Sequence, residues 1–192
     1  MIIHLIRHGK TVANEEQLYC GVTDIPLSEA GIADILRLRA QGIYPPNEGV
    51  YFSSGLLRAV QTLHALYGSV EQTAIPELAE FNFGSFEMKS YLMLKNQSDY
   101  QTWIADGTGL VPCPGGESKQ VFTRRVIKGF HFLAENALRG KDIYAVCHGG
   151  VIGCIMEHLF PDTRDFYQWQ PEPGRGYTLT RTLEKVYSYK AI

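Results

Sequence analysis

Two short apolar segments, far apart in the chain, both end in a histidine that is followed by glycine. Residues 2–8 read IIHLIRH, and residues 142–148 read DIYAVCH. Apolar runs of this length predict strands that are buried inside a sheet. A surface turn is more readily built with Asn, Asp or Ser, so an imidazole at each strand tip indicates a chemical role.

Strand and helix patterns alternate along the rest of the chain. This alternation predicts an α/β fold with a largely parallel central sheet, whose ligands sit beyond the carboxyl ends of the strands. At 192 residues the chain is expected to form one domain. We expect strands at residues 2–6, 49–54, 73–78, 142–148, 177–183 and 185–191, and helices at residues 27–42, 55–68, 88–106, 117–138 and 149–160.

The first two predicted helices carry apolar residues at helical spacing. Ser28 is expected to cap the first of them, because its hydroxyl can accept from a free backbone N–H. The expected apolar stripe of this helix consists of Ile32, Ile35, Leu36 and Leu38. That of the second helix consists of Leu56, Leu57, Val60, Leu63 and Leu66.

Composition narrows the possible partners. The formal net charge of -2 argues against a nucleic-acid or anionic-membrane surface, which needs a basic face. Neither a secretion leader nor an apolar run of about 20 residues is visible, so we expect a cytoplasmic protein. Reduced thiols that bind no zinc are expected at all four cysteines, Cys20, Cys113, Cys147 and Cys154.

The segment IRHGKTVAN, residues 6–14, ends the first predicted strand. Arg7 is a rigid fork suited to phosphate oxygens, and His8 can attack phosphorus when its ring nitrogen is unprotonated. Gly9 allows a ligand to approach the backbone, and Asn14 can add a neutral hydrogen bond. Taken alone, the segment is equally consistent with a surface turn.

Two further segments place basic residues at strand-to-helix junctions. In FSSGLLRAVQT, Arg58 lies in the first turn of a helix and can point back toward the strand end. In AVCHGGVIG, His148 repeats the first pattern, and Gly149 and Gly150 can offer backbone N–H groups to an oxyanion. The alternative for Arg58 alone is a solvated helix residue.

An acidic group is expected near these basic residues. Glu80 follows a short strand and precedes a glycine-containing turn, where its carboxyl group could protonate a leaving alkoxide. Glu77 and Glu87 are competitors on composition alone. Two arginines, two histidines and one acid supply the positioning and charge that phosphoryl transfer needs, and they do so with no metal and no cofactor.

These segments, with GVTDIPLSEAG, ELAEFNFGSFE and PGGES between them, resemble the histidine phosphatase superfamily, also called phosphoglycerate mutase-like proteins. The resemblance implies a three-layer α/β/α sandwich and a phosphohistidine intermediate on His8. It implies a phosphate pocket completed by Arg7, Arg58 and His148, with help from Asn14, and Glu80 as proton donor. The remaining implied substrate contacts are Cys20 and Gly21, in the substrate loop, and Gly149.

Within the superfamily, LYCGVTDIPLS, FGSFEM and PGGES resemble α-ribazole-5′-phosphate phosphatases of cobalamin synthesis more than glycolytic mutases. The implied partners are a small phosphomonoester as substrate and inorganic phosphate as product. A phosphoglycerate mutase or broad-specificity phosphatase is one alternative, and a phosphate-binding module without turnover is another. Lys10 stands where an acidic or amide residue is commoner, which adds positive charge at the pocket rim.

Residues 81–116 are rich in aromatic side chains and separate the two halves of the predicted sheet. We expect part of this segment to fold over the pocket as a lid with a flat apolar wall. The alternative is that its aromatic residues pack the segment onto the sheet. The expected C-terminal strands pair either within one subunit or between the subunits of a homodimer.

Overall fold

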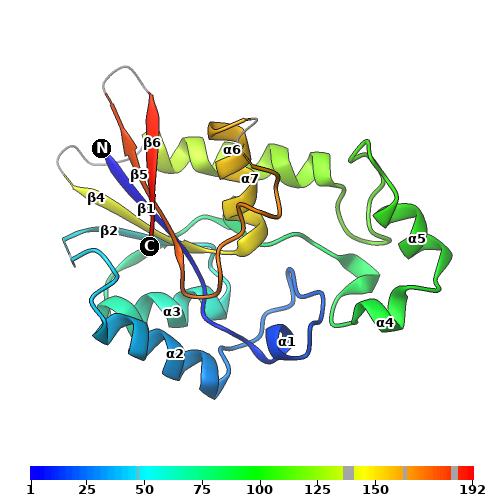
Figure 1. Cartoon of the computed structure of the whole chain (residues 1–192), viewed down its shortest axis with the longest axis horizontal. Helices are drawn as coiled ribbons and strands as arrows, with labels where there is room; N and C mark the ends of the chain where they lie inside the picture. Colours follow the sequence, from blue (N-terminus) through cyan, green and yellow to red (C-terminus); the bar gives the residue numbers. More distant parts are fainter. Residues whose placement is uncertain (47, 136–140, 162–163, 183–185) are drawn as a thin grey trace.

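One six-stranded sheet organises the chain (Figure 1). The structure, a computed structural model, describes residues 1–46, 48–135, 141–161, 164–182 and 186–192. The strand order across the sheet is β3-β2-β4-β1-β5-β6. The strands are β1 (Ile2–Arg7), β2 (Gly49–Ser53), β3 (Gln72–Ala74), β4 (Asp142–Cys147), β5 (Gly176–Arg181) and β6 (Tyr187–Ala191).

The sheet is parallel from β3 to β1 and antiparallel beyond it, which confirms the predicted α/β class. β5 pairs with β1 and β6 pairs with β5, both antiparallel. The C-terminal strands therefore pair within one chain, which is the first of the two alternatives that the sequence left open. A homodimer stays a prediction.

Helices cover both faces of the sheet and give three layers (Figure 1). Successive side chains of a strand point to opposite faces, so Ile3 and Leu5 of β1 join one apolar cluster and Ile6 joins the other. The first cluster contains residues of α6 (Lys119–Glu135) and α7 (Gly149–Leu159), and the second contains residues of α2 (Glu29–Ala40) and α3 (Leu57–Tyr67).

The start of α2 confirms the predicted cap, because the Ser28 hydroxyl accepts from Gly31 N at 3.0 Å. The predicted stripe is half wrong: Ile35 and Leu38 are buried, but Ile32 is 39% exposed and Leu36 46% exposed. The buried face of α2 is narrow and follows Gly31, Ile35 and Leu38. In α3, Leu63 and Leu66 are buried as predicted, whereas Leu57 lies on the exposed side.

The predicted helix over residues 88–106 is two short helices, α4 (Tyr91–Leu94) and α5 (Ser98–Ile104). Two 3-10 turns, η1 (Pro76–Leu78) and η2 (Gly84–Phe86), precede them. A four-residue helix that we did not predict, α1 (Val12–Glu15), follows the tip of β1. The end of the predicted helix 117–138 lies partly outside the described residues, since α6 is described as far as Glu135.

The aromatic residues of segment 81–116 divide between the two expectations. Phe86 and Tyr100 are fully buried and pack the segment onto the protein, as the alternative reading held. Tyr91 is exposed. Phe83 and Trp103 are partly buried and line a pocket described below. Closure of this segment as a lid stays a prediction. Among the described helices, none is long and apolar enough to cross a membrane.

Trp169 anchors the stretch between α7 and β5. Its side chain is fully buried, and its ring packs against Phe160, Tyr177 and Tyr189, with centroid distances of 6.0, 5.7 and 5.1 Å. This contact joins the end of α7 to both C-terminal strands.

We expect Trp169→Ala to lower the free energy of unfolding by about 3–5 kcal/mol, because a large buried ring leaves a cavity. Urea unfolding followed by far-UV circular dichroism measures the change. Tyr167→Ala is the matched control: this nearby ring is 79% exposed, so its loss is expected to change stability by about 0.5 kcal/mol or less. Equal losses in the free energy of unfolding from the two variants would contradict the anchoring role of Trp169.

Candidate active site

The two strand-tip histidines lie side by side because β1 and β4 are neighbouring parallel strands. The register places Arg7 opposite Cys147, and the His8 backbone N–H donates to the Cys147 carbonyl at 3.0 Å. The His8 and His148 rings meet edge to face, with centroids 5.0 Å apart. The sheet thus brings together two residues that are 140 positions apart in the sequence.

The hydrogen bonding of His8 fixes its ring state. Nδ1 lies 2.6 Å from the Gly9 carbonyl, which can only accept, so Nδ1 carries the proton. The neutral ring then has its lone pair on Nε2. Burial, followed by the charge of Arg58, lowers the pKa of His8 to about 3, so the ring is neutral near pH 7.

His148 is also buried and neutral. Its Nε2 shares a hydrogen bond of 2.8 Å with Ser54 Oγ, at the end of β2. Its Nδ1 is buried with no hydrogen-bond partner among the described residues. Burial, followed by the neighbouring His8, lowers the pKa of His148 well below its ordinary value. Sequence analysis did not single out Ser54, although its position at a strand end was a usable signal.

Arg7 brings a guanidinium group to the same place. It donates from Nη1 to the Pro171 carbonyl at 2.7 Å, and its Nε is buried without a partner among the described residues. Burial lowers the pKa of Arg7. A Cβ at Gly149 would lie 3.0 Å from the Arg7 Cζ, so the missing side chain makes room for the guanidinium. A buried unpaired N–H is costly, and an anion beside it would satisfy it.

Arg58 is 1% exposed, which excludes the reading of a solvated helix residue. From the first turn of α3 it donates to the Gly21 carbonyl at 2.5 Å and to the Thr23 carbonyl at 2.9 Å. No carboxylate among the described residues forms an ion pair with it. Its positive charge is therefore held in the interior by backbone dipoles alone.

The Glu80 carboxylate lies at the N-terminus of α7. It accepts from Gly150 N at 2.9 Å and from its neighbour Phe81 N at 2.9 Å. A Cβ at Gly150 would come within 2.4 Å of Glu80 Oε1, so only glycine allows this approach. The Gly150 amide that we expected to face an oxyanion is occupied by Glu80.

An arginine that sequence analysis missed holds the backbone beneath Glu80. Arg125 of α6 donates to the Ala79 carbonyl at 2.7 Å and to the Glu80 carbonyl at 2.8 Å. Its Nε donates to Glu117 at 3.0 Å, and Glu117 in turn accepts from Asn82 N at 2.8 Å. Arg125 gives no sequence signal of this role, because it lies in a helix with several other basic residues.

The two competing acids are used elsewhere. Glu77 pairs with Lys128 at 3.3 Å on the surface. Glu87 accepts hydrogen bonds from several backbone amides of residues 21–23. Of the three candidate acids, Glu80 is the one that lines the pocket described next.

Of the remaining residues that the sequence singled out, Asn14 and Cys20 line the same pocket, and Gly21 and Lys10 do not. The Asn14 Oδ1 accepts from Thr11 N at 2.9 Å. The Gly21 amide, in contrast, donates to Glu87 at 3.0 Å and is not free for a ligand. Lys10 forms a 3.0 Å ion pair with Asp34, which offsets the positive charge that we expected at the rim.

One pocket connects Arg7 and Glu80 of the polar site with an aromatic wall, while His8, Arg58 and His148 are not among its lining residues. Its volume is about 350 Å³, and its polar end contains Arg7, Asn14, Glu80 and Gly150. Sequence analysis missed most of the rest of its lining, because these residues come from loops brought together by the fold. The other lining residues are Leu18, Tyr19, Cys20, Phe81, Phe83, Trp103, Ile104, Lys119, Phe166, Tyr167 and Gln170.

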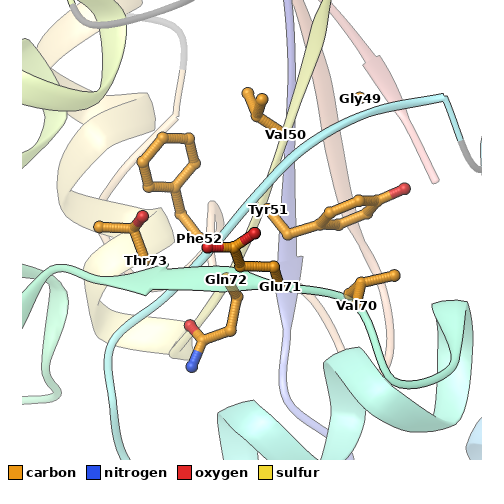
Figure 2. Close-up of a pocket in the computed structure, with 8 residues that line it drawn as sticks. All are labelled: Gly49, Val50, Tyr51, Phe52, Val70, Glu71, Gln72 and Thr73. Carbon is orange, nitrogen blue, oxygen red and sulfur yellow. The ribbon is translucent and has the colours of Figure 1, made fainter.

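A second hollow, of about 480 Å³, lies along β2 and β3 (Figure 2). Its lining runs over residues 49–52 and 70–73 and includes none of the predicted site residues. Glu71 is the one carboxylate among its described lining residues, and none of them is a lysine, arginine or histidine. This hollow therefore lacks the chemistry of the first pocket. Within the described ranges, no three His, Cys, Asp or Glu side chains cluster as a metal-binding group.

Two neutral imidazoles, the buried Arg58 and the partly buried Arg7 lie beyond the carboxyl ends of parallel strands, an arrangement suited to an α/β enzyme that acts on phosphate esters. Residues 3–183 match the family profile of the histidine phosphatase superfamily (branch 1). The chain belongs to this superfamily and is a phosphatase, as its motifs predicted.

Named relatives and solved structures agree with this membership. The chain is 33% identical over 163 residues to the adenosylcobalamin/alpha-ribazole phosphatase of Salmonella typhimurium, covering 83% of this chain and 79% of the relative. It is 29% identical to the 2,3-bisphosphoglycerate-dependent phosphoglycerate mutase 2 of Gloeobacter violaceus, covering 84% and 78%. The crystal structure of the alpha-ribazole phosphatase from Shigella flexneri superposes with a TM-score of 0.85 at 26% identity, covering 100% and 96%.

The buried neutral His8 makes stability depend on pH. Its folded pKa is about 3 and its ordinary value is 6.5, so the unfolded chain binds a proton that the folded chain does not. This contribution is fully present above pH 6.5 and is lost as the pH falls toward 3. Between pH 6.5 and about pH 5 we expect His8 to account for a loss of about 2 kcal/mol.

Urea unfolding near pH 7.5 and near pH 5, in a buffer without phosphate, measures this loss in the wild type and in His8→Gln. The variant is expected to lose less stability between the two pH values. His64→Gln is the control, since His64 lies exposed on α3 and its replacement is expected to leave the pH dependence unchanged. An unchanged pH dependence in His8→Gln would contradict the neutral buried state.

Proposed function

We propose that this phosphatase transfers the phosphoryl group of a small monoester to Nε2 of His8 and then to water. The phosphate group would lie between His8 and His148, with Arg7 and Arg58 against its oxygens. Support comes from the unpartnered Arg7 Nε and His148 Nδ1, two buried nitrogens that a bound anion would satisfy.

The neutral state of both imidazoles serves this chemistry. A neutral His8 has a lone pair available for attack on phosphorus, whereas a protonated ring has none. Since the histidines contribute no charge, the positive charge beside the bound phosphate would come from the two arginines. Buried guanidinium groups act on a bound phosphate through a medium of low dielectric, where their attraction is stronger than in water.

The reaction would proceed in two displacements. First, the bond from phosphorus to the ester oxygen breaks as the bond to His8 Nε2 forms, and the leaving oxygen takes the proton of the Glu80 carboxyl group. Water then attacks the phosphohistidine and gives its proton to the Glu80 carboxylate. The phosphorus–nitrogen bond breaks, inorganic phosphate leaves, and His8 is restored.

We propose α-ribazole 5′-phosphate as the substrate. The observation that carries this proposal is the continuity of one pocket from Arg7 and Glu80 to an aromatic wall that includes Tyr19, Phe83 and Trp103. A nucleoside-like leaving group has a flat base that needs such a surface, and stacking of a base on a ring is worth about 1–3 kcal/mol. The similarity to relatives named alpha-ribazole phosphatase supports the same choice.

A phosphoglycerate substrate is the second candidate, because one lysine does reach the pocket. Lys119 lines it and lies 5.2 Å from the centroid of the Phe166 ring, so it could face a substrate carboxylate. Two other lysines do not line the pocket: Lys10 pairs with Asp34, and Lys89 donates to the Ser85 carbonyl at 2.7 Å.

We expect kcat/KM for α-ribazole 5′-phosphate to exceed that for 3-phosphoglycerate by at least about tenfold, the rate equivalent of about 1.4 kcal/mol. Steady-state assays on the two esters, with and without bisphosphoglycerate, measure the ratio. Trp103→Ala is expected to reduce the preference through lost stacking, whereas Tyr91→Ala, an exposed aromatic in the same segment, is expected to leave it unchanged.

Equal rates on the two esters would leave a phosphatase of broad specificity. A preference for 3-phosphoglycerate that disappears in Lys119→Met would replace the α-ribazole proposal with the phosphoglycerate reading.

We expect His8→Ala to abolish turnover of every phosphomonoester, because each requires the nucleophile. Glu80→Gln is expected to slow alkyl phosphates by about 10²–10⁴-fold and p-nitrophenyl phosphate far less, because nitrophenolate leaves readily without a proton. Burst kinetics on p-nitrophenyl phosphate and steady-state rates on an alkyl phosphate measure the two effects. A Glu80→Gln variant slowed equally on both esters would remove Glu80 as the proton donor.

A further inference from the structure

We propose that Glu87 is a positioning residue that fixes Arg58 in the phosphate pocket through the loop of residues 21–23. The loop lies between two side chains: its N–H groups donate to the Glu87 carboxylate, and its carbonyl groups accept from the Arg58 guanidinium. This proposal rests on the proposed function, because it assigns a further residue to the same phosphate site.

The Glu87 carboxylate organises the loop through its donors. Oε2 accepts from Gly21 N at 3.0 Å, from Thr23 N at 3.3 Å and from the Thr23 hydroxyl at 2.6 Å. Oε1 accepts from Val22 N at 3.1 Å and from Phe83 N at 3.0 Å. One carboxylate thus replaces the water that would otherwise solvate four backbone amides, and hydrogen bonds to a charged acceptor are the stronger kind.

The carbonyl groups of the same loop hold Arg58. Gly21 donates its N–H to Glu87 and offers its carbonyl to Arg58 Nη2, and Thr23 does the same with Arg58 Nη1. Since Arg58 is 1% exposed and has no carboxylate partner among the described residues, these two carbonyls decide where its guanidinium points. The peptide group between Gly21 and Val22 is bonded at both ends, its N–H to Glu87 and its carbonyl to Arg58, so polarisation by Glu87 strengthens that bond to Arg58.

The loop has no room to shift. A Cβ at Gly21 would lie 1.6 Å from the Phe81 carbonyl oxygen and 2.7 Å from Glu87 Oε1. The loop therefore packs directly against the backbone of the segment that carries Glu87. A change at Glu87 acts on Arg58 through this contact and through the hydrogen bonds, although Glu87 itself does not line the pocket.

This geometry also separates Glu87 from acid catalysis. Its carboxylate does not line the pocket that a leaving group would enter, whereas Glu80 does. A proton donor acts on the leaving group alone, whereas a residue that positions Arg58 acts on every phosphate that enters. The two roles therefore predict different dependence on the leaving group and on the affinity for phosphate.

The test begins with the binding of inorganic phosphate to Glu87→Gln by isothermal titration calorimetry. We expect affinity to fall about tenfold or more, because an amide can neither accept all these bonds nor polarise the loop. Turnover of p-nitrophenyl phosphate and of an alkyl phosphate is expected to fall by the same factor. Glu87→Asp, which keeps the charge, is expected to recover part of the affinity.

A double-variant cycle asks whether Glu87 acts through Arg58. Adding Glu87→Gln to Arg58→Ala is expected to cause little further loss of phosphate affinity, since the group that Glu87 positions is already gone. Additive losses in the double variant would overturn the proposal. So would unchanged phosphate affinity in Glu87→Gln, or a loss of turnover confined to the alkyl phosphate, which would instead make Glu87 the proton donor.

Two controls separate positioning from general loss of stability. Leu133→Ala removes a fully buried side chain of α6 outside the site, so it lowers stability while phosphate affinity is expected to stay the same. Glu77→Gln removes a surface carboxylate and is expected to change neither stability nor phosphate affinity. Failure of Leu133→Ala to retain phosphate affinity would show that any destabilisation weakens the site, which would overturn the assignment to Glu87.

Should Glu87→Gln fail to fold, Thr23→Val removes the 2.6 Å bond from the hydroxyl alone and is expected to weaken phosphate binding about threefold. Unchanged binding in Thr23→Val would count against the proposal. Because phosphate binding is measured without turnover, this outcome is distinct from failure of the proposed function, which would appear as a wild-type protein that hydrolyses no phosphomonoester.

Discussion

The parallel pairing of β1 with β4 is the contact on which the site depends. Each strand ends in an imidazole, and the register that sets Arg7 beside Cys147 brings the two rings to 5.0 Å. A slip of one residue would turn the alternate side chains of β1 to the wrong faces of the sheet, so the buried apolar positions also protect the register. The same backbone contacts that stabilise the sheet thus fix the geometry of its carboxyl edge.

Around that edge two arginines form no direct ion pair with a carboxylate of the described residues. Arg58 is held by two carbonyls, and Arg7 by one carbonyl with its Nε unpaired among the described residues. Burying such charges is expensive, and the protein limits the cost by leaving both histidines neutral. Under the proposed function, an incoming phosphate dianion would find charge and donors already in place, so little reorganisation would be needed on binding.

The parts of this structure that follow from local patterns were predictable. Apolar runs identified β1 and β4, and Ser28 marked the start of α2. The buried face of α2 was not predictable, because burial of Ile32 or Leu36 depends on which part of the protein packs against the helix. The supports of the site were missed for a related reason. Arg125 and Ser54 are ordinary residues in sequence, and their roles exist only where the chain folds back on Glu80 and His148.

The strand order has a consequence for how the chain is made. β4 lies between β2 and β1, so β1 has no neighbouring strand until residues 142–147 have been synthesised, whereas β2 can pair with β3 earlier. Until then the apolar β1 emerges from the ribosome with open hydrogen-bonding edges on both sides, a state prone to aggregation. Because loops must close over more than 130 residues to join β1 to β4, sheet formation is slow and late. The strand that carries His8 at its tip therefore stays without either neighbouring strand until residues 142–147 have been made.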